Sequence, residues 1–426
     1  MIQSIKGMRD ILPPASAVWN EVEAVARRIF ARFNYREIRT PVLEETALFS
    51  RSVGEETDIV SKEMYTFEDR DGSSLTLRPE NTASVLRAYI EHRLDQQPGL
   101  QKLYYIGPMF RRERPQKGRY RQFYQIGAEA IGSDSPAVDA EVIEMVVTIL
   151  YELGIGGFEL LINSVGSKES RIRFNDALRA ELKEVAAGMC EDCRRRAETN
   201  PSRVLDCKVP QDQPIIDRLP SILDYLDEAD AEHFRRVREY LDDRQIRYTV
   251  KPRLVRGLDY YARTTFEITH GALGAQNAIL GGGRYDGLAE SLGSKVAAPG
   301  IGFSIGEDRL VMTVEEGKAI QPPSLDLYIA PMDDAALRHC ATLAGDLRKL
   351  DLSVEVGTER KLKRMMELAN KLAARYVLIV GDNEISTQSY ALKDMASGQQ
   401  QTLSRAGLLE FVKKVRRGGS EIGPNG

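Results

Sequence analysis

Residues 110–123 read FRRERPQKGRYRQF, and no other stretch of the 426-residue chain is as informative. Six basic residues and one acidic residue, Glu113, lie between positions 111 and 121, with a proline and a glycine that predict a turn in the middle. Guanidinium groups bind phosphate through paired hydrogen bonds, and Phe110 and Phe123 offer rings on which a base can stack. A solvated basic hairpin is the alternative interpretation of such a charge run. The interleaved aromatic residues favour a nucleotide site.

The segments on either side of this stretch predict regular structure. KLYYIGPMF at 102–110 and RQFYQIGAEAIG at 121–132 are apolar and aromatic, which makes the basic stretch the loop of a long hairpin. Asp71-Gly72 predicts a shorter hairpin upstream. Apolar residues at three- and four-residue spacings predict a helix over 15–33.

Changes in sequence pattern divide the chain into parts. Strand signals vanish after about residue 166, where helical pieces alternate with prolines, and they resume after residue 250. Beyond a Gln-Pro-Pro-Ser linker at 321–324, short apolar runs alternate with helical stretches, which predicts a small α/β domain with a largely parallel core. The predicted parts are a first segment 1–166, a helical insertion 167–250, a second segment 251–320 that completes the domain begun by the first, the α/β domain 325–418 and a disordered tail 419–426.

Composition excludes several classes of protein. Hydrophobic residues make up 42% and charged residues 29%, as in ordinary globular proteins. No run approaches the ~20 apolar residues that span a bilayer, and the N-terminus has no secretion signal, so we expect a cytoplasmic protein with no membrane partner. The net charge of −4 argues against a strongly basic protein but leaves room for a local basic surface. A P-loop is absent, and GIGFSIG at 300–306 misses the dinucleotide-binding spacing.

Four further motifs carry possible chemistry. They are TLRPENT at 76–82, LVRGLDYYART at 254–264, GGGRYDGL at 281–288 and GIGFSIGEDRL at 300–310. A carboxylate at a strand end could hold an ammonium group, and three successive glycines allow a ligand to approach the backbone. Each motif alone also fits a purely structural role; for example, Asn81 or Thr82 could simply cap a helix.

Taken together, these stretches resemble the class II aminoacyl-tRNA synthetases, and among them the histidyl-tRNA synthetase family. REIRTPVLEETALF at 36–49 resembles the dimer-forming motif 1 of that class, the basic hairpin its motif 2, and GIGFSIGEDRL its motif 3. LVRGLDYY and GGGRYDGL are similar to the two histidine-specific motifs. The resemblance covers nearly the whole chain.

This resemblance implies an α+β protein. Its catalytic domain would be built on an antiparallel sheet, with a helical insertion and a C-terminal α/β anticodon-binding domain. It implies ATP-dependent attachment of L-histidine to tRNA(His) by a homodimer, through histidyl-adenylate, with release of pyrophosphate and AMP. Mg²⁺ would accompany ATP, and no tightly bound organic cofactor is expected.

The resemblance also assigns roles to individual residues. The expected histidine-binding residues are Glu80, Asn81, Thr82, Gln125, Glu129, Tyr260, Tyr261 and Tyr285. The expected ATP-binding residues are Arg111, Glu113, Arg119, Phe123 and Arg309. Arg256 and Arg111 are the expected catalytic residues, and Arg114, Gln116 and Lys117 are expected to contact tRNA.

Two alternatives remain at this point. A non-catalytic paralogue, similar to the regulatory subunit of ATP-phosphoribosyltransferase, would lack the anticodon-binding domain and the histidine-specific motifs, whereas this chain has both. Cys190, Cys193 and Cys207 could ligate zinc, but the nearest histidine is His233 and no fourth ligand is evident. We therefore predict no metal ligand in the chain and expect structural zinc to be absent.

Overall fold

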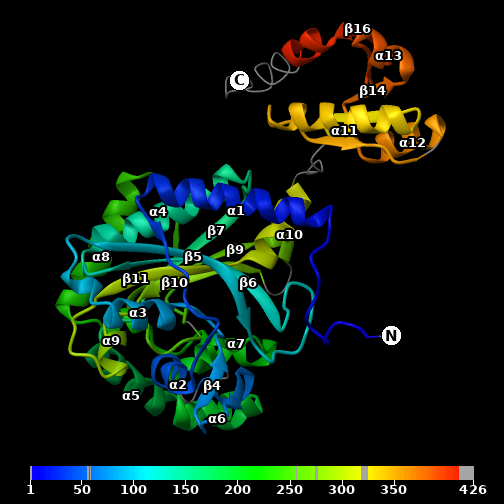
Figure 1. Ribbon diagram of the computed structural model, residues 1–426. Helices are drawn as coiled ribbons and strands as arrows, with labels where there is room; N and C mark the ends of the chain where they lie inside the picture. The colour runs from blue at the N-terminus through cyan, green and yellow to red at the C-terminus, as the bar shows by residue number, and fades with distance from the viewer. Residues whose placement is uncertain are drawn as a thin grey trace. The chain divides into compact units, whose positions relative to one another are not determined.

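The computed structural model describes residues 2–54, 57, 59–255, 257–273, 277–317, 325–359 and 361–411. The chain forms two compact units, Met1–Ile320 and Gln321–Gly426 (Figure 1). The predicted linker and tail lie outside the described residues, as do Arg256 and Arg360. Among the helices of the described part, none is long and apolar enough to span a membrane.

An eight-stranded sheet forms the centre of the first unit. Its strand order is β1 (Arg36–Glu37), β5 (Gln101–Phe110), β6 (Gln122–Ile131), β11 (Gly300–Gly306), β10 (Ala278–Arg284), β9 (Ala262–His270), β7 (Phe158–Ser164) and β8 (Thr249–Val250). The pairs from β5 through β7 are antiparallel, while β1 and β8 join the two edges in parallel. The expected antiparallel sheet is thus confirmed.

Both predicted hairpins are present. Strands β5 and β6 pair from Gln101 opposite Ile131 to Phe110 opposite Gln122, with the basic loop beyond them. The shorter hairpin joins β3 (Tyr65–Glu68) and β4 (Ser74–Leu77), which form a small sheet with β2 (Leu43–Glu45). Its turn contains Gly72 with a φ of +86°, a backbone conformation that glycine adopts without strain.

Helices cover both faces of the large sheet (Figure 1). On one side lie α1 (Ala15–Arg32), α4 (Pro136–Glu152) and α10 (Glu307–Gly317), and on the other α3 (Thr82–Glu91) and α9 (Leu288–Ser291). The spacing that predicted α1 puts Val22, Ala26 and Ile29 on its buried face, where they join the main hydrophobic core. Helix α2 (Thr46–Val53), the π-helical turn η1 (Ile59–Glu63) and the 3-10 turns η2 (Leu94–Gln96) and η7 (Gly271–Leu273) complete this unit outside the insertion.

Residues 165–248, all of which the structure describes, contain helices and turns but no strand. The elements are α5 (Lys168–Val185), η3 (Ala186–Gly188), α6 (Glu191–Thr199), η4 (Pro201–Asp206), η5 (Pro210–Asp212), α7 (Gln213–Ile216), η6 (Ile222–Tyr225) and α8 (Glu228–Asp243). Ser167 and Asp227 begin the two long helices by accepting hydrogen bonds from backbone N–H groups. A small separate core, which includes Phe174, Leu178 and Cys193, holds the segment together.

The second unit has a five-stranded sheet. Its order is β13 (Val354–Val356), β12 (Leu327–Pro331), β14 (Tyr376–Val380), β15 (Ser389–Asp394) and β16 (Gln400–Ser404), with helices α11 (Asp334–Arg348), α12 (Leu362–Lys371) and α13 (Asp382–Thr387). The first three strands are parallel, as the alternation of apolar runs and helices predicts. The last two add an antiparallel hairpin that the sequence pattern did not reveal.

Candidate active site

A cavity of about 150 Å³ lies against the large sheet and collects most of the predicted histidine-binding residues. Its lining includes Glu80, Thr82, Arg111, Gln125, Tyr260, Tyr261 and Tyr285. Glycines on the central strands make room for these side chains. A Cβ at Gly302 would lie 1.7 Å from Glu129 Oε2, and one at Gly283 would lie 2.8 Å from a ring carbon of Tyr261.

Glu129 is the buried carboxylate of this site. Its Oε1 accepts a hydrogen bond from Thr82 Oγ1 at 2.8 Å and its Oε2 accepts one from the Tyr285 hydroxyl at 2.8 Å. Tyr105, which the sequence analysis did not single out, donates to Oε1 at 3.4 Å. Burial raises the pKa of Glu129 to about 8. Glu129 does not itself line the cavity, but two of its hydroxyl donors, Thr82 and Tyr285, do.

Glu80 is fixed by the helix that follows it. Its carboxylate oxygens accept the backbone N–H groups of Thr82 at 2.7 Å and Ala83 at 3.0 Å, which makes Glu80 the cap of α3. Burial raises the pKa of Glu80, and these hydrogen bonds together with Arg111 oppose the rise. The side chains of Asn81 and Thr82 do not cap the helix.

Asn81 occupies a different environment from the other predicted histidine ligands. Its Oδ1 accepts hydrogen bonds from Thr40 Oγ1 at 2.6 Å and from Arg78 at 3.3 Å, and the residue is not part of the cavity lining. It supports the turn beneath Glu80. A direct contact between Asn81 and histidine therefore stays a prediction.

Aromatic residues form the walls of the cavity. The rings of Tyr260 and Tyr261 lie 4.8 Å apart, and those of Tyr260 and Tyr285 meet edge to face at 6.1 Å. Burial raises the pKa of Tyr260 and Tyr285 well above the usual value, so both hydroxyls stay protonated and can donate hydrogen bonds. Gln125 is buried beside them, and its Oε1 has no hydrogen-bond partner among the described residues.

Three arginines extend the site beyond the cavity. The guanidinium of Arg111 donates to the carbonyl of Pro79 at 2.9 Å and lies 5.3 Å from the centre of the Phe123 ring. Glu113 lies between two cations, 3.7 Å from Arg111 and 3.1 Å from Arg119.

Arg309 reaches the same place from α10. It donates to the carbonyls of Ala278 at 2.8 Å and Gly118 at 3.3 Å. Burial, followed by the positive charge of Arg119, lowers the pKa of Arg309. Several cations gathered around one carboxylate favour a polyanionic ligand, because it would relieve their mutual repulsion.

The tip of the basic hairpin is open to solvent. Arg114, Gln116 and Lys117 are all exposed there, and Gln116 pairs with Arg119 across the turn. The base of the hairpin is held by the N-terminal segment, because the Arg121 N–H donates to the carbonyl of Gly7 at 2.7 Å. The sequence analysis missed this contact between distant segments.

A buried ion-pair network supports the cavity from below. Arg284, fully buried in the GGGRYDGL motif, donates to Asp139 at 2.8 Å, to Asp286 at 2.6 Å and to the Ser133 carbonyl at 2.8 Å. The adjacent Tyr285 reaches Glu129. The motif arginine is therefore structural, whereas the motif tyrosine is part of the pocket.

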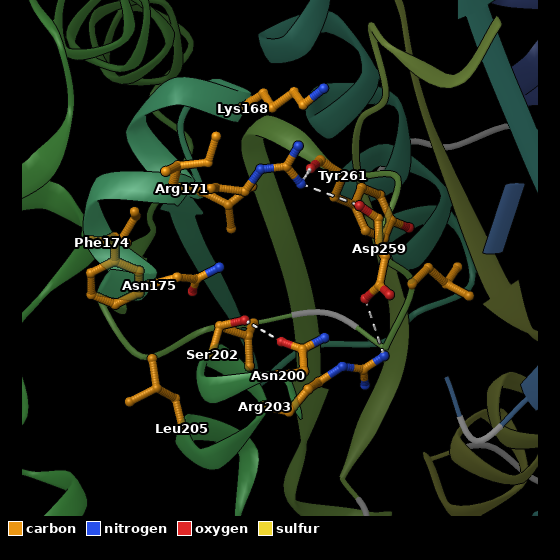
Figure 2. Close-up of a pocket in the computed structure, with 15 residues that line it drawn as sticks. Lys168, Arg171, Phe174, Asn175, Asn200, Ser202, Arg203, Leu205, Asp259 and Tyr261 are labelled. Carbon is orange, nitrogen blue, oxygen red and sulfur yellow. Dashed lines mark hydrogen bonds and ion pairs between the residues drawn. The ribbon is translucent and has the colours of Figure 1, made fainter. Parts of the chain in front are cut away.

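A second cavity, of about 290 Å³, lies between the helical insertion and the loop that carries Tyr261, a residue that also lines the first cavity (Figure 2). Arg171 donates to the carbonyls of Tyr261 at 2.6 Å and Asp259 at 3.2 Å, and Arg203 donates to the carbonyl of Gly257 at 2.7 Å. Figure 2 shows both arginines pointing toward Asp259 from the insertion side. The insertion thus positions the loop that carries Tyr260 and Tyr261. Arg256, in the same loop, lies outside the described residues.

This fold and site define a class II aminoacyl-tRNA synthetase. A family model described as Histidyl-tRNA synthetase matches residues 7–310, and one described as Anticodon binding domain matches residues 326–415. The chain belongs to the histidyl-tRNA synthetase family. The predicted fold class and enzyme class are thereby confirmed, and the regulatory paralogue is not favoured.

Individual relatives align with this chain over nearly its full length. A Histidine--tRNA ligase of Solibacter usitatus (strain Ellin6076) is 71% identical over 406 residues, 95% of this chain and 97% of that protein. One of Koribacter versatilis (strain Ellin345) is 55% identical over 100% of both chains. The crystal structure of apo S. aureus histidyl-tRNA synthetase superposes with a TM-score of 0.82 at 39% identity, covering 97% of this chain and 100% of that chain.

Proposed function

We propose that the chain joins L-histidine to tRNA(His) in two ATP-dependent steps at the cavity on the large sheet. The observation that carries the proposal is that two kinds of binding site adjoin each other. A small pocket with a buried carboxylate and tyrosine hydroxyls opens directly onto a group of arginines, and Arg111 belongs to both. Such a site can hold an amino acid and a nucleotide triphosphate end to end.

Histidine would be recognised through paired hydrogen bonds. Its imidazole carries one donor and one acceptor nitrogen when neutral, and the carboxyl of Glu129 and the hydroxyl of Tyr261 supply the matching pair. Glu80, Thr82 and Gln125 would receive the α-amino and carboxylate groups. Because an unmatched analogue leaves buried polar groups without partners, this pocket discriminates strongly without an editing step.

ATP would lie along the arginines. Phe123 offers a face for the adenine ring and Glu113 accepts from the adenine edge, while Arg111, Arg119 and Arg309 neutralise the phosphates. The carboxylate of Glu267 acts electrostatically on Arg309, so an oxygen ligand suited to Mg²⁺ would lie near the proposed phosphate position. Mg²⁺, when bound with ATP, would add charge neutralisation at the phosphates.

The reaction needs little proton transfer in its first step. The histidine carboxylate is already anionic, so the chain's task is to bring two anions together and stabilise the charge that develops at the α-phosphorus. Arg111 is fixed for this by the Pro79 carbonyl and the Phe123 ring. Arg256 is the second proposed cation and rests on the family resemblance alone. The terminal ribose hydroxyl of tRNA then attacks the activated carbonyl, which releases AMP.

Transfer RNA would contact two places on the chain. The exposed Arg114, Gln116 and Lys117 would meet the acceptor end, and the second unit would bind the anticodon. Lys361, Lys363 and Arg364 stand at the start of α12 and offer described cations for this contact. The basic residues at 413–417 lie outside the described residues.

The proposed assembly is a cytoplasmic homodimer that pairs through residues 36–49. In the single chain, Val42 and Leu43 are 36% and 37% exposed, and Leu43 begins β2, an edge strand of the three-stranded sheet. Exposed apolar residues at a sheet edge suit an interface between identical subunits. Light scattering at micromolar concentration should give the mass of a dimer, and a monomer mass would contradict this assembly.

Aminoacylation of a tRNA(His) transcript by the purified chain tests the function. We expect histidine-dependent charging that requires ATP and is absent with a tRNA(Phe) transcript of similar size. Failure to charge tRNA(His), while histidine-dependent exchange of pyrophosphate into ATP proceeds, would contradict the tRNA assignment but leave the adenylation site intact.

A further inference from the structure

We propose that Cys190, Cys193, Cys207 and Asp212 bind a structural zinc ion in the helical insertion. The ligand atoms of these four residues all lie within 4.8 Å of one another. The sequence argument against zinc depended on a missing fourth ligand, and it searched for a histidine. The structure supplies that ligand as Asp212, so the expected absence of a metal site is revised.

The spacing of the ligand atoms suits tetrahedral zinc. The Sγ atoms of Cys190 and Cys207 lie 3.9 Å apart, and Cys207 Sγ lies 3.3 Å from Asp212 Oδ2. Zinc–sulfur bonds of about 2.3 Å and zinc–oxygen bonds of about 2.0–2.2 Å place tetrahedral ligands about 3.6–3.8 Å apart. These two separations differ from the tetrahedral values by a few tenths of an ångström, and the remaining ones, all within 4.8 Å, would have to shorten by at most about 1 Å.

Backbone groups already orient the ligands. The N–H of Cys190 donates to both oxygens of Asp212, at 3.2 and 3.3 Å, and the N–H of Val209 donates to Cys207 Sγ at 3.4 Å. Cys190 is the residue that begins α6, and Cys193 lies in the first turn of this nine-residue helix.

Asp212 provides an independent reason to expect a cation. Its side chain is fully buried and accepts hydrogen bonds from the Cys190 N–H and the Cys207 thiol, and among the described residues no lysine or arginine forms an ion pair with it. Buried charges in proteins are commonly paired with a counter-charge or coordinate a metal. A divalent ion held by the three neighbouring sulfurs would supply that counter-charge.

The proposed ion would crosslink three short elements. Cys190 and Cys193 begin α6, Cys207 follows η4, and Asp212 ends η5. These elements have only a small apolar core to hold them. Since η4 carries Arg203, whose guanidinium donates to the Gly257 carbonyl, the ion would also steady the insertion side of the cavity in Figure 2. Small segments of this kind commonly gain their stability from metal.

Two other interpretations fit the same atoms. The three thiols could remain protonated and hydrogen-bond to Asp212, or Cys190 and Cys207 could form a disulfide. Neither interpretation requires a metal ion, so both predict a chain that contains no zinc.

Metal content of the full-length chain tests the proposal. The chain is purified without chelators, supplied with zinc chloride, dialysed, and analysed by inductively coupled plasma mass spectrometry. We expect about one zinc ion per chain in the parent protein, and at least about a tenfold loss in Cys193→Ala and in Cys207→Ala. Cys340→Ala is the matched control, because Cys340 is equally buried but lies in α11, in the other unit. It should keep the parent's zinc.

A second measurement holds even if the cysteine variants fail to fold. Cobalt(II) added to the parent chain should give the intense visible bands and thiolate charge-transfer absorption of a tetrahedral sulfur site, and zinc should abolish them. The proposal would be overturned if the parent chain held no stoichiometric zinc, gave no such cobalt spectrum and had all three thiols open to alkylation. A Cys190–Cys207 disulfide found by mass spectrometry in the protein as isolated from cells would overturn it too, as would equal zinc loss in Cys340→Ala.

Discussion

Replacing Glu129 by glutamine tests the histidine pocket most sharply, because the change keeps the shape of the side chain and removes the carboxyl that ionises above its pKa of about 8. In the parent, Glu129 accepts hydrogen bonds from Thr82 and Tyr285, both at 2.8 Å, and is fully buried. Hydroxyl groups can rotate to serve the amide of the variant, so the fold should persist. The substitution should therefore weaken the binding of histidine.

The expected size follows from hydrogen-bond energies. At pH 9, where the Glu129 carboxyl with its pKa of about 8 is largely ionised, a bond from the imidazole N–H to the charged carboxylate contributes ~1.5–3 kcal/mol, and a neutral bond contributes ~0.5–1.5 kcal/mol. The difference of ~1–2 kcal/mol predicts a roughly 5- to 30-fold weaker dissociation constant for histidine. Isothermal titration calorimetry measures this constant directly, and the Michaelis constant for ATP in pyrophosphate exchange should stay within about twofold of the parent.

Glu113→Gln is the matched control for this experiment, because Glu113 pairs with Arg111 and Arg119 on the nucleotide side. This variant should weaken ATP binding and leave histidine binding unchanged. The reasoning would be refuted if Glu129→Gln bound histidine as tightly as the parent, or if the two variants affected both substrates alike.

Three further predictions concern the fold, pH and tRNA. Arg284→Met should lower the free energy of unfolding by ~3–5 kcal/mol in chemical denaturation, because it leaves a buried carboxylate unpaired, whereas removing the exposed Arg235 should leave the free energy of unfolding nearly unchanged. Burial raises the pKa of Glu307 from 4.5 to about 9, so the folded chain retains a proton that the unfolded chain releases; the stability from this group is complete below pH 4.5 and lost as pH rises toward 9. Glu307→Gln should therefore be more stable than the parent at pH 8.5, by up to about 5 kcal/mol in the free energy of unfolding, and should unfold at a higher temperature there. Near pH 4.5 the two proteins should be equally stable. Equal gains in stability at both pH values would contradict the linkage. Arg114→Ala with Lys117→Ala should raise the Michaelis constant for tRNA and flatten its salt dependence while histidine-dependent pyrophosphate exchange is kept; loss of exchange would place these residues in adenylation instead.

The sequence alone predicted those features that depend on neighbouring residues. The long β5–β6 hairpin, the helix at Ala15–Arg32 and the parallel strands of the second unit all follow from local spacing of apolar and turn residues. The cap of α3 was missed for a local reason. Asn81 and Thr82 both looked like ordinary caps, yet the buried carboxylate of Glu80 accepts the N–H groups instead.

Contacts between distant segments could not be predicted in this way. Tyr105 joins Glu129 only because the register of β5 and β6 brings the two residues near each other, and spacing along the chain does not fix that register. Arg9 forms an ion pair with Asp308 at 2.8 Å, although 299 residues separate the two in the sequence. Asp212 was overlooked because an isolated aspartate gives no metal-binding signal until the turns fold it onto the cysteines.

Amino-acid-dependent exchange of labelled pyrophosphate into ATP by the purified chain tests the central claim most directly. Each of the twenty standard amino acids is supplied in turn, at equal concentration, with ATP and Mg²⁺. We predict exchange with L-histidine at least about 10⁴-fold above any other amino acid, because a pocket of matched buried hydrogen bonds rejects analogues that lack the imidazole pair. Exchange that does not depend on histidine, or that proceeds equally with another amino acid, would contradict the account.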